Sequence, residues 1–161
     1  MNTAPIKKYA PKARKDFIAA VTRQAAKVGI TAKGSDPMEL KGDLALINDR
    51  AFPKGIANAR NALARLVAQN GFAQTMEQAA YSWFNRLCAI RYMELKGFLD
   101  HGRRVLSHPG HTGHFEILDE CLELDLSVLD ASLDREKLVQ LKLDGSKDEE
   151  LYRELLLAQC H

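Results

Sequence analysis

Hydrophobic residues recur every three or four positions through most of the chain, a spacing that is typical of amphipathic helices. The first half contains three such stretches, at residues 11–28, 54–70 and 75–96, and a glycine follows each of them as a stop signal. Pro11 suits the first turn of a helix, and Thr75 with Gln78 could form a capping box for the third stretch. The pattern therefore predicts three long helices in residues 11–96.

The second half predicts shorter helices separated by irregular segments. Glycine and proline punctuate residues 98–113, which indicates a loop. Helical spacing returns at 114–123, 134–143 and 147–161, and the connector "LDLSVLD" carries leucines that we expect to pack. The chain stops within an apolar helical run, so we expect the last helix to continue beyond it and to expose leucines that a neighbouring domain covers.

Residues 34–53 break the helical period. Met38 and Leu40, then Leu44 and Leu46, alternate at period two around Lys-Gly-Asp, which favours a short β-hairpin near residues 38–47. A helix capped by Ser35 is the competing interpretation. The predicted fold class is mainly α: a multi-helix domain with one short hairpin, formed by residues 1–161 as a single domain.

The stretch "YSWFNRLCAIRYMELKGF", residues 81–98, holds the only tryptophan of the chain. On a helical wheel, Trp83, Leu87 and Ile90 line one stripe, and further apolar residues widen it: Tyr81, Cys88, Tyr92 and Leu95. Such a wide apolar surface predicts a central helix that is covered on most sides. Asn85 falls opposite the stripe.

Arg91 and Glu94 are charged residues inside this apolar stripe, and their spacing of three lets the side chains meet. One interpretation is a buried ion pair that fixes helix packing, since a lone buried charge is costly. The other is a contact to a further domain. We expect Trp83, Asn85, Arg86, Arg91 and Glu94 to act as structural or interdomain residues.

Charge is distributed unevenly. Residues 1–104 contain 18 lysines and arginines against eight acids, whereas residues 105–161 contain five against 13. This indicates either a polarised surface or two halves that pair with each other. A basic helix face is usually only a solvated face, but it is also the electrostatic signature of a nucleic-acid contact. The candidate phosphate-binding residues are Lys7, Lys8, Lys12, Arg14, Lys15, Arg23 and Lys27, with Arg103 and Arg104.

Composition narrows the class of protein. The apolar fraction of 46% and charged fraction of 27% are those of an ordinary globular protein. The three cysteines are odd in number and far apart, which predicts reduced thiols in a cytoplasmic protein. The chain has no run of about 18 apolar residues, so we expect no membrane span.

The sequence offers weak candidates for metal chemistry. His108, His111 and His114 are spaced by three, but the intervening glycines and proline indicate a polar loop rather than a zinc site, and we predict no metal. A nuclease-like module at Asp36, Glu39 and Lys41 is a further, weaker hypothesis, since its Glu-x-Lys is not preceded by a suitably distant acid.

Motifs for cofactor binding and catalysis are missing from the chain. The ten glycines never form a Gly-x-Gly-x-x-Gly cradle, and the five prolines are never adjacent, so the Asn-Pro-Pro-Tyr motif of adenine methyltransferases does not occur. There is no Gly-x-Ser-x-Gly either. We predict no catalytic and no cofactor-binding residue in these 161 positions.

The order of four segments nevertheless resembles a known family: "AYSWFNRLCAIRYMELKGFL", "HGRRVLS", "HFEILDECLELDL" and "DEELYRELLLAQCH". Together they are similar to the N-terminal region of the PglX proteins, the adenine-specific DNA methyltransferases of bacteriophage exclusion (BREX) systems. The similarity covers most of residues 54–161 and, weakly, the basic N-terminus.

The resemblance implies a large parent enzyme that transfers a methyl group from S-adenosylmethionine to adenine N6 in DNA, as part of phage defence. Its catalytic domain would follow residue 161. The implied partners are DNA, the methyltransferase domain of the same protein and other phage-defence proteins. The implied role is a non-catalytic helical domain that assists DNA binding and interdomain packing. A pure scaffold that docks partners without touching DNA is the alternative.

Overall fold

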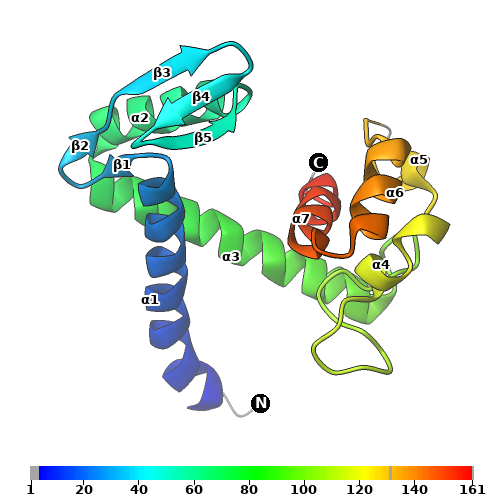
Figure 1. The fold of residues 1–161 in the computed structure, drawn as a ribbon. Coiled ribbons are helices and arrows are strands. Elements are labelled where there is room, and N and C mark those ends of the chain that lie inside the picture. Colours follow the sequence, from blue (N-terminus) through cyan, green and yellow to red (C-terminus); the bar gives the residue numbers. More distant parts are fainter. Residues whose placement is uncertain (1–3, 131, 161) are drawn as a thin grey trace. The chain divides into compact units, whose positions relative to one another are not determined.

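The computed structural model describes residues 4–130 and 132–160. It is mainly α, with small antiparallel sheets, as the sequence predicts (Figure 1). The chain divides into two compact units with the boundary between Phe84 and Asn85, and each is described by itself. None of the helices in this described part of the chain combines the length and the apolar character that a membrane span requires.

The first unit begins with a long helix and continues through five short strands. The elements are α1 (Ala4–Lys27), β1 (Ile30–Thr31), β2 (Gly34–Ser35), β3 (Met38–Lys41), β4 (Leu44–Ile47), β5 (Arg50–Pro53) and α2 (Ile56–Asn70). Helix α3 (Phe72–Lys96) then carries the chain across the unit boundary.

Helix α1 is longer than predicted because Pro11 lies inside it rather than in its first turn. The preceding segment, "APIKKYA", is rich in alanine and lysine, which favour helix. A proline in a helix interior removes one backbone hydrogen bond. The favourable propensity of this segment offsets that loss, so the helix starts at Ala4.

The hairpin near residues 38–47 is confirmed: β3 pairs with β4 in antiparallel register from Met38–Ile47 to Lys41–Leu44. The third strand, β5, was not predicted from the sequence; it extends the sheet in the order β3-β4-β5. Asn48 and Asp49 both have positive φ, 48° and 60°, and form the two-residue turn that joins β4 to β5. Such a turn matches the twist of the strands, which explains a hairpin at Asn-Asp.

The core of the first unit packs α1, β1, α2 and α3 around Ala25, Ile30 and Met76. Gly29 ends α1 with a φ of +70°, and a Cβ at this position would lie 2.7 Å from Ile47 Cγ2. Arg60, buried on α2, donates from Nε to the Val28 carbonyl at 2.8 Å. These contacts hold the segment after α1 against α2 and the three-stranded sheet.

Helix α3 begins at Phe72, so the predicted start at Thr75 and its capping box are wrong. Gly71, at φ +82°, alone separates α2 from α3. Thr75 is buried inside the helix, and its hydroxyl donates to the Gly71 carbonyl at 2.8 Å instead of capping an end. The tight glycine turn lets the next helix start earlier than the cap signal suggests.

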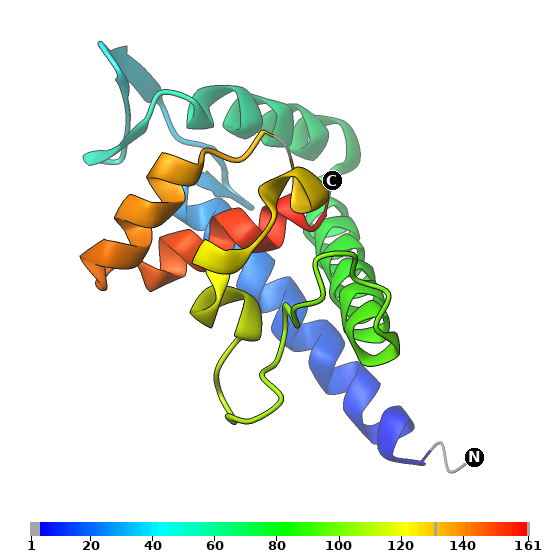
Figure 2. The ribbon, with the colours of Figure 1, turned by 90° about the vertical axis from the view of Figure 1, so that its right-hand side faces the viewer.

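The second unit consists of short helices around one core. They are α4 (Glu116–Asp119), a 3₁₀ turn (Cys121–Glu123), α5 (Leu126–Leu129), α6 (Arg135–Asp144) and α7 (Asp148–Ala158). The loop predicted before them is confirmed, and the connector "LDLSVLD" contains a short helix that the sequence did not predict. Helix α7 packs beside α6 and α4 (Figure 2).

Two sequence expectations about exposure are wrong. The leucines of α7 are not left for a neighbour, because Leu151 and Leu155 are fully buried against the core of the second unit. Conversely, α3 is not covered on most sides, because Tyr81, Tyr92 and Leu95 are exposed. Apolar periodicity shows which face of a helix is hydrophobic, but tertiary packing decides which part of that face is covered.

Candidate nucleic-acid interface

Five of the predicted phosphate-binding residues form one row along the exposed side of α1. Lys8, Lys12, Lys15, Arg23 and Lys27 are all exposed, and the steps between them fit a single helical stripe. The stripe is interrupted once, at the exposed Ala19, which occupies the step between Lys15 and Arg23. We refer to the five cations as the α1 basic row.

The length of the α1 basic row suits a polyanion. From Lys8 to Lys27 the helix rises about 28 Å at 1.5 Å per residue. Each strand of a DNA duplex carries one phosphate per roughly 3.4 Å of its axis. Several phosphates can therefore lie within reach of the row, and long lysine side chains can adapt to their positions.

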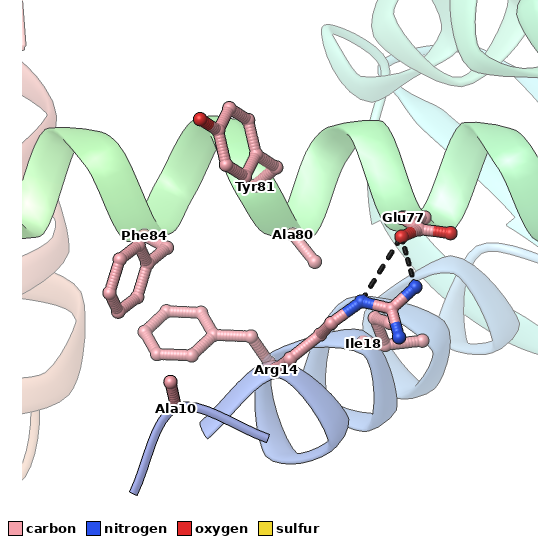
Figure 3. A pocket seen from close by; sticks show the side chains of 8 residues that line it. Ala10, Arg14, Ile18, Glu77, Ala80, Tyr81 and Phe84 are labelled. Carbon is pink, nitrogen blue, oxygen red and sulfur yellow. Dashed lines mark hydrogen bonds and ion pairs between the residues drawn. The ribbon is translucent and has the colours of Figure 1, made fainter. Parts of the chain in front are cut away.

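The other two cations of α1 lie on a different side. Lys7 falls outside the stripe, and Arg14 faces α3, where its guanidinium forms an ion pair with Glu77 and its Nε lies 3.1 Å from Glu77 Oε1 (Figure 3). Both partners are largely exposed, so the pair adds little to stability. The positive charge of Arg14 is therefore already paired with the Glu77 carboxylate within the first unit.

Beside this ion pair, α1 and α3 enclose an apolar pocket of about 200 Å³ (Figure 3). Ala10 and Ile18 of α1 face Ala80 and Phe84 of α3 across it. The rings of Phe17 and Phe84 meet edge to face at 5.6 Å. The inner side of α1 is thus occupied by packing against α3, which leaves the opposite side, with the basic row, facing solvent.

Charge around the row has one dominant sign. The chain through Phe84 contains 13 lysines and arginines against six acids, a net charge of +7, and Asp16 is the only acid of α1. An excess of one sign attracts counter-charged partners over a Debye length of about 8–10 Å at moderate salt. The first unit therefore presents a positive surface to an approaching polyanion.

Sequence reasoning missed one residue of this surface, Tyr9. Its side chain is exposed at the start of the row, next to Lys8. Exposed aromatic rings among cations are typical of surfaces that stack on nucleobases. The sequence does show an aromatic residue, Tyr9, within the basic segment. The structure was needed to show that Tyr9 lies on the exposed side of α1.

Arg103 and Arg104 lie in the second unit, in the loop before α4. The Arg103 guanidinium pairs with Glu120 at 2.7 Å and with Glu123 at 3.5 Å. Arg104 is half-buried, and its backbone N–H donates to Glu116 Oε2 at 2.8 Å. Two acids thus pair with the Arg103 side chain, and one accepts the backbone N–H of Arg104.

Glu94 is the buried centre of a polar cluster in the second unit. Its side chain is 0% exposed and pairs with Arg91, which is 44% exposed, so the expected ion pair forms but only its acid is buried. Glu94 Oε2 also accepts the backbone N–H groups of Val105 and Leu106 at 2.9 and 2.8 Å, and Oε1 accepts the Ser107 hydroxyl at 3.0 Å. One carboxylate therefore anchors the loop that follows α3.

The protonation of this cluster follows from its hydrogen bonds. Burial alone raises the pKa of Glu94, but the donors from Leu106, Arg91 and Ser107 outweigh it and hold the pKa below its ordinary value of 4.5. Burial also raises the pKa of Tyr152 to about 12, and its hydroxyl donates to the Val105 carbonyl at 3.1 Å. Glu94 is therefore held in its charged form and acts as an anchor for the loop.

The remaining predicted residues lie along α3. Trp83 is half-buried in the first unit, and Asn85 and Arg86 are exposed in the second. Trp83 and Arg86 both have interaction partners within the chain. Their assignment as structural or interdomain residues remains a prediction.

The weak metal candidates do not assemble a site in the part of the chain that the structure covers. No group of three or more His, Cys, Asp or Glu side chains there is placed to hold a metal ion. The rings of His108, His111 and His114 lie next to one another in tilted orientations, with centroids 4.7 and 5.8 Å apart. Glu39 instead pairs with Lys41 at 3.4 Å.

Comparison with known proteins identifies the relatives of this chain. It is 45% identical over 166 aligned residues to the adenine-specific methyltransferase BrxX of Escherichia coli O9:H4 (strain HS), an alignment that covers the whole chain. It is 30% identical over 159 residues to the adenine-specific methyltransferase PglX of Lacticaseibacillus casei (strain Zhang), with 89% of the chain covered. No family model matches the chain.

These relatives are much longer than the chain, which spans 14% of BrxX and 13% of PglX. The chain is thus homologous to a small part of BREX adenine-specific methyltransferases, and the predicted resemblance is confirmed.

Proposed function

We propose that this homologue of a BREX methyltransferase segment serves as a non-catalytic helical N-terminal domain of a site-specific adenine-N6 DNA methyltransferase in phage defence. In this proposal it assists DNA binding and packs against the remainder of the enzyme. S-adenosylmethionine, the donor of the methyl group, would bind outside these 161 residues. The observation that carries the proposal is the match of the entire chain to one segment of curated adenine-specific methyltransferases.

The α1 basic row supports the DNA-binding part of the proposal. A methyltransferase that modifies one base must hold the surrounding duplex, and phosphate contacts supply much of that affinity without reading sequence. Lys8, Lys12, Lys15, Arg23 and Lys27 form a solvated row in which the exposed Asp16 is the one acid of the helix, whereas the Arg103 guanidinium is paired with Glu120. We therefore centre the phosphate contacts on α1 and treat Lys7, Arg14, Arg103 and Arg104 as secondary.

The test is a titration of duplex DNA with the 161-residue chain across a range of salt concentrations. Each phosphate contact contributes a slope of about −0.9 in log affinity against log salt. Charge reversal at Lys12, Lys15 and Arg23 is expected to flatten the slope by about three and to weaken binding at low salt by about tenfold or more.

A matched control reverses Lys33, Lys54 and Arg65, which are exposed in the same unit but outside the row. Both triple variants change the net charge equally, so a general charge effect would weaken both alike. Equal loss in the two variants, or affinity that does not fall with salt, contradicts the phosphate contacts. A parent enzyme that modifies DNA unchanged after the row is reversed would favour the scaffold alternative.

A further inference from the structure

The end of α3 presents an apolar surface that the second unit leaves uncovered. Tyr92 is 57% exposed, Leu95 59% and Phe98 62%. The rings of Tyr92 and Phe98 meet edge to face with centroids 6.2 Å apart, and Leu95 is one turn from Tyr92 on the same side of the helix. We call these three residues the α3 end patch. Contiguous exposed apolar surface of this kind marks interaction sites.

Local backbone structure holds the α3 end patch in place. The N–H of Phe98 donates to the Met93 carbonyl at 2.9 Å, and the N–H of Gly97 donates to the Glu94 carbonyl at 3.4 Å. With Gly97 at φ +67°, these bonds form a Schellman motif, which terminates the helix in a defined geometry. The next residue, Leu99, turns back into the core. Phe98 is therefore fixed outward by the helix end.

The neighbouring apolar surfaces already have partners within the second unit. Leu151 and Leu155 of α7 are fully buried, and Phe115 stacks on Tyr152 with ring centroids 4.2 Å apart. The apolar face of α7, which the sequence had assigned to a neighbour, is thus satisfied. The second unit also exposes Leu122, Val128 and Leu143. The α3 end patch differs from them because it brings two aromatic rings into contact beside a third exposed apolar side chain.

We propose that the α3 end patch is the docking surface for the remainder of a BREX-type methyltransferase, the polypeptide that lies outside the matched segment. This proposal rests on the proposed function. The chain corresponds to only 14% of BrxX, so a relative carries most of its polypeptide outside this segment. Covering three large apolar side chains removes them from water, which favours association.

The experiment places the whole 161-residue chain in E. coli BrxX in exchange for the segment that it matches. Phe98 is replaced by the photoreactive analogue p-benzoylphenylalanine, which preserves an aromatic ring at the position. After illumination, crosslinked peptides are identified by mass spectrometry. Crosslinks from position 98 to BrxX residues outside the exchanged segment are the expected result.

The control carries the same photoreactive residue at Leu143, which is 77% exposed on α6 in the same unit. The proposal is overturned if position 98 crosslinks only to a second copy, only within the exchanged segment, or no more than position 143 does. A second copy as the occupant would also appear as a dimer of the 161-residue chain in sedimentation.

A second variant separates docking from folding. Tyr92→Ser with Leu95→Ser removes exposed groups, so the isolated chain is expected to keep its melting temperature, while the chimera loses the crosslinks from position 98. Loss of crosslinks together with loss of folding in the isolated chain would mean that the patch is structural, and would overturn the proposal. Salt-dependent DNA binding by the α1 basic row is measured separately, so failure of one proposal leaves the other testable.

Discussion

At the scale of single residues, Glu94 organises more of the second unit than its neighbours in sequence suggest. The spacing to Arg91 predicted an ion pair, and the structure contains it. No sequence pattern indicated that the same carboxylate would also accept the backbone N–H groups of Val105 and Leu106, more than ten residues away. Long-range partners of a buried charge depend on tertiary packing and cannot be read from local periodicity.

Replacing Glu94 with glutamine is expected to destabilise the chain by about 1–3 kcal/mol, because charge-assisted hydrogen bonds become neutral and one acceptor becomes a donor facing other donors. Urea denaturation followed by circular dichroism measures the change. The matched control is Glu120→Gln, which breaks the more exposed pair with Arg103 and is expected to cost about 0–1 kcal/mol. Equal costs for the two variants would contradict the role of Glu94 as an anchor.

The stability that Glu94 contributes is expected to depend on pH. Its pKa in the folded chain is below the ordinary value of 4.5, so the unfolded chain takes up the proton first as the pH falls. The contribution is therefore fully present above 4.5 and is lost as the pH falls through the folded-state pKa. Unfolding free energies of the wild type and Glu94→Gln should converge in this acidic range; a constant difference would contradict the assignment.

Gly29 combines a left-handed backbone with a close neighbour. It has a φ of +70°, and an added Cβ would lie 2.7 Å from Ile47 Cγ2. Gly29→Ala is expected to destabilise the chain by about 1–3 kcal/mol through backbone strain and displacement of β4. Thermal unfolding measures this. Gly34 also has a positive φ, but a Cβ added there meets nothing within 4 Å. Gly34→Ala should therefore destabilise the chain less, and it measures the backbone strain without the steric clash.

At the scale of elements, the helices were predictable where an apolar stripe ends at a glycine. Residues 54–70 and α2 agree to within two positions, and the hairpin at 38–47 followed from period-two alternation. The prediction failed where local signals compete. Pro11 and Thr75 resemble helix starts, but both lie inside helices because strong propensity precedes the first and a one-residue glycine turn precedes the second. Strand β5 was missed because Pro53 indicated a boundary, whereas proline is tolerated at the end of an edge strand.

The gap at Ala19 gives a gain-of-function prediction for α1. Ala19→Lys completes the α1 basic row and is expected to make the salt dependence of DNA binding steeper by about 0.9 and the binding tighter at low salt. Fluorescence anisotropy with labelled duplex at several salt concentrations measures both quantities. Ala62→Lys, at an exposed position of α2, adds the same charge elsewhere in the unit. If the two substitutions change the salt dependence of DNA binding equally, the α1 basic row contributes no more to DNA binding than other parts of the unit.

At the scale of the whole molecule, charge separates along the chain. Residues up to Phe84 have a net charge of +7, and those from Asn85 contain ten lysines and arginines against 15 acids, a net charge of −5. The sequence showed this asymmetry but could not show which cations are matched locally. The structure supplies that distinction, because Arg103 is paired with acids while the cations of the α1 basic row face solvent. The sequence thus indicated which half of the chain is basic, and the positions of the side chains reduced the main candidate phosphate-binding residues to one face of α1.

Methyl transfer is expected to be carried out by the rest of a methyltransferase and not by this chain. The 161 residues contain neither a glycine-rich cofactor cradle nor Asn-Pro-Pro-Tyr, so the purified chain with S-adenosylmethionine and DNA is expected to transfer no methyl group above background. The chimera with E. coli BrxX should methylate adenine, because 45% identity over the whole chain preserves the packing surfaces of the exchanged segment. Reversal of Lys12, Lys15 and Arg23 in that chimera should lower methylation most at low salt and at DNA concentrations below saturation, where the lost phosphate contacts contribute most to DNA affinity. Methyl transfer by the isolated chain would contradict its non-catalytic role, and a reversed chimera as active as the unreversed one at every salt concentration would leave the chain as a scaffold.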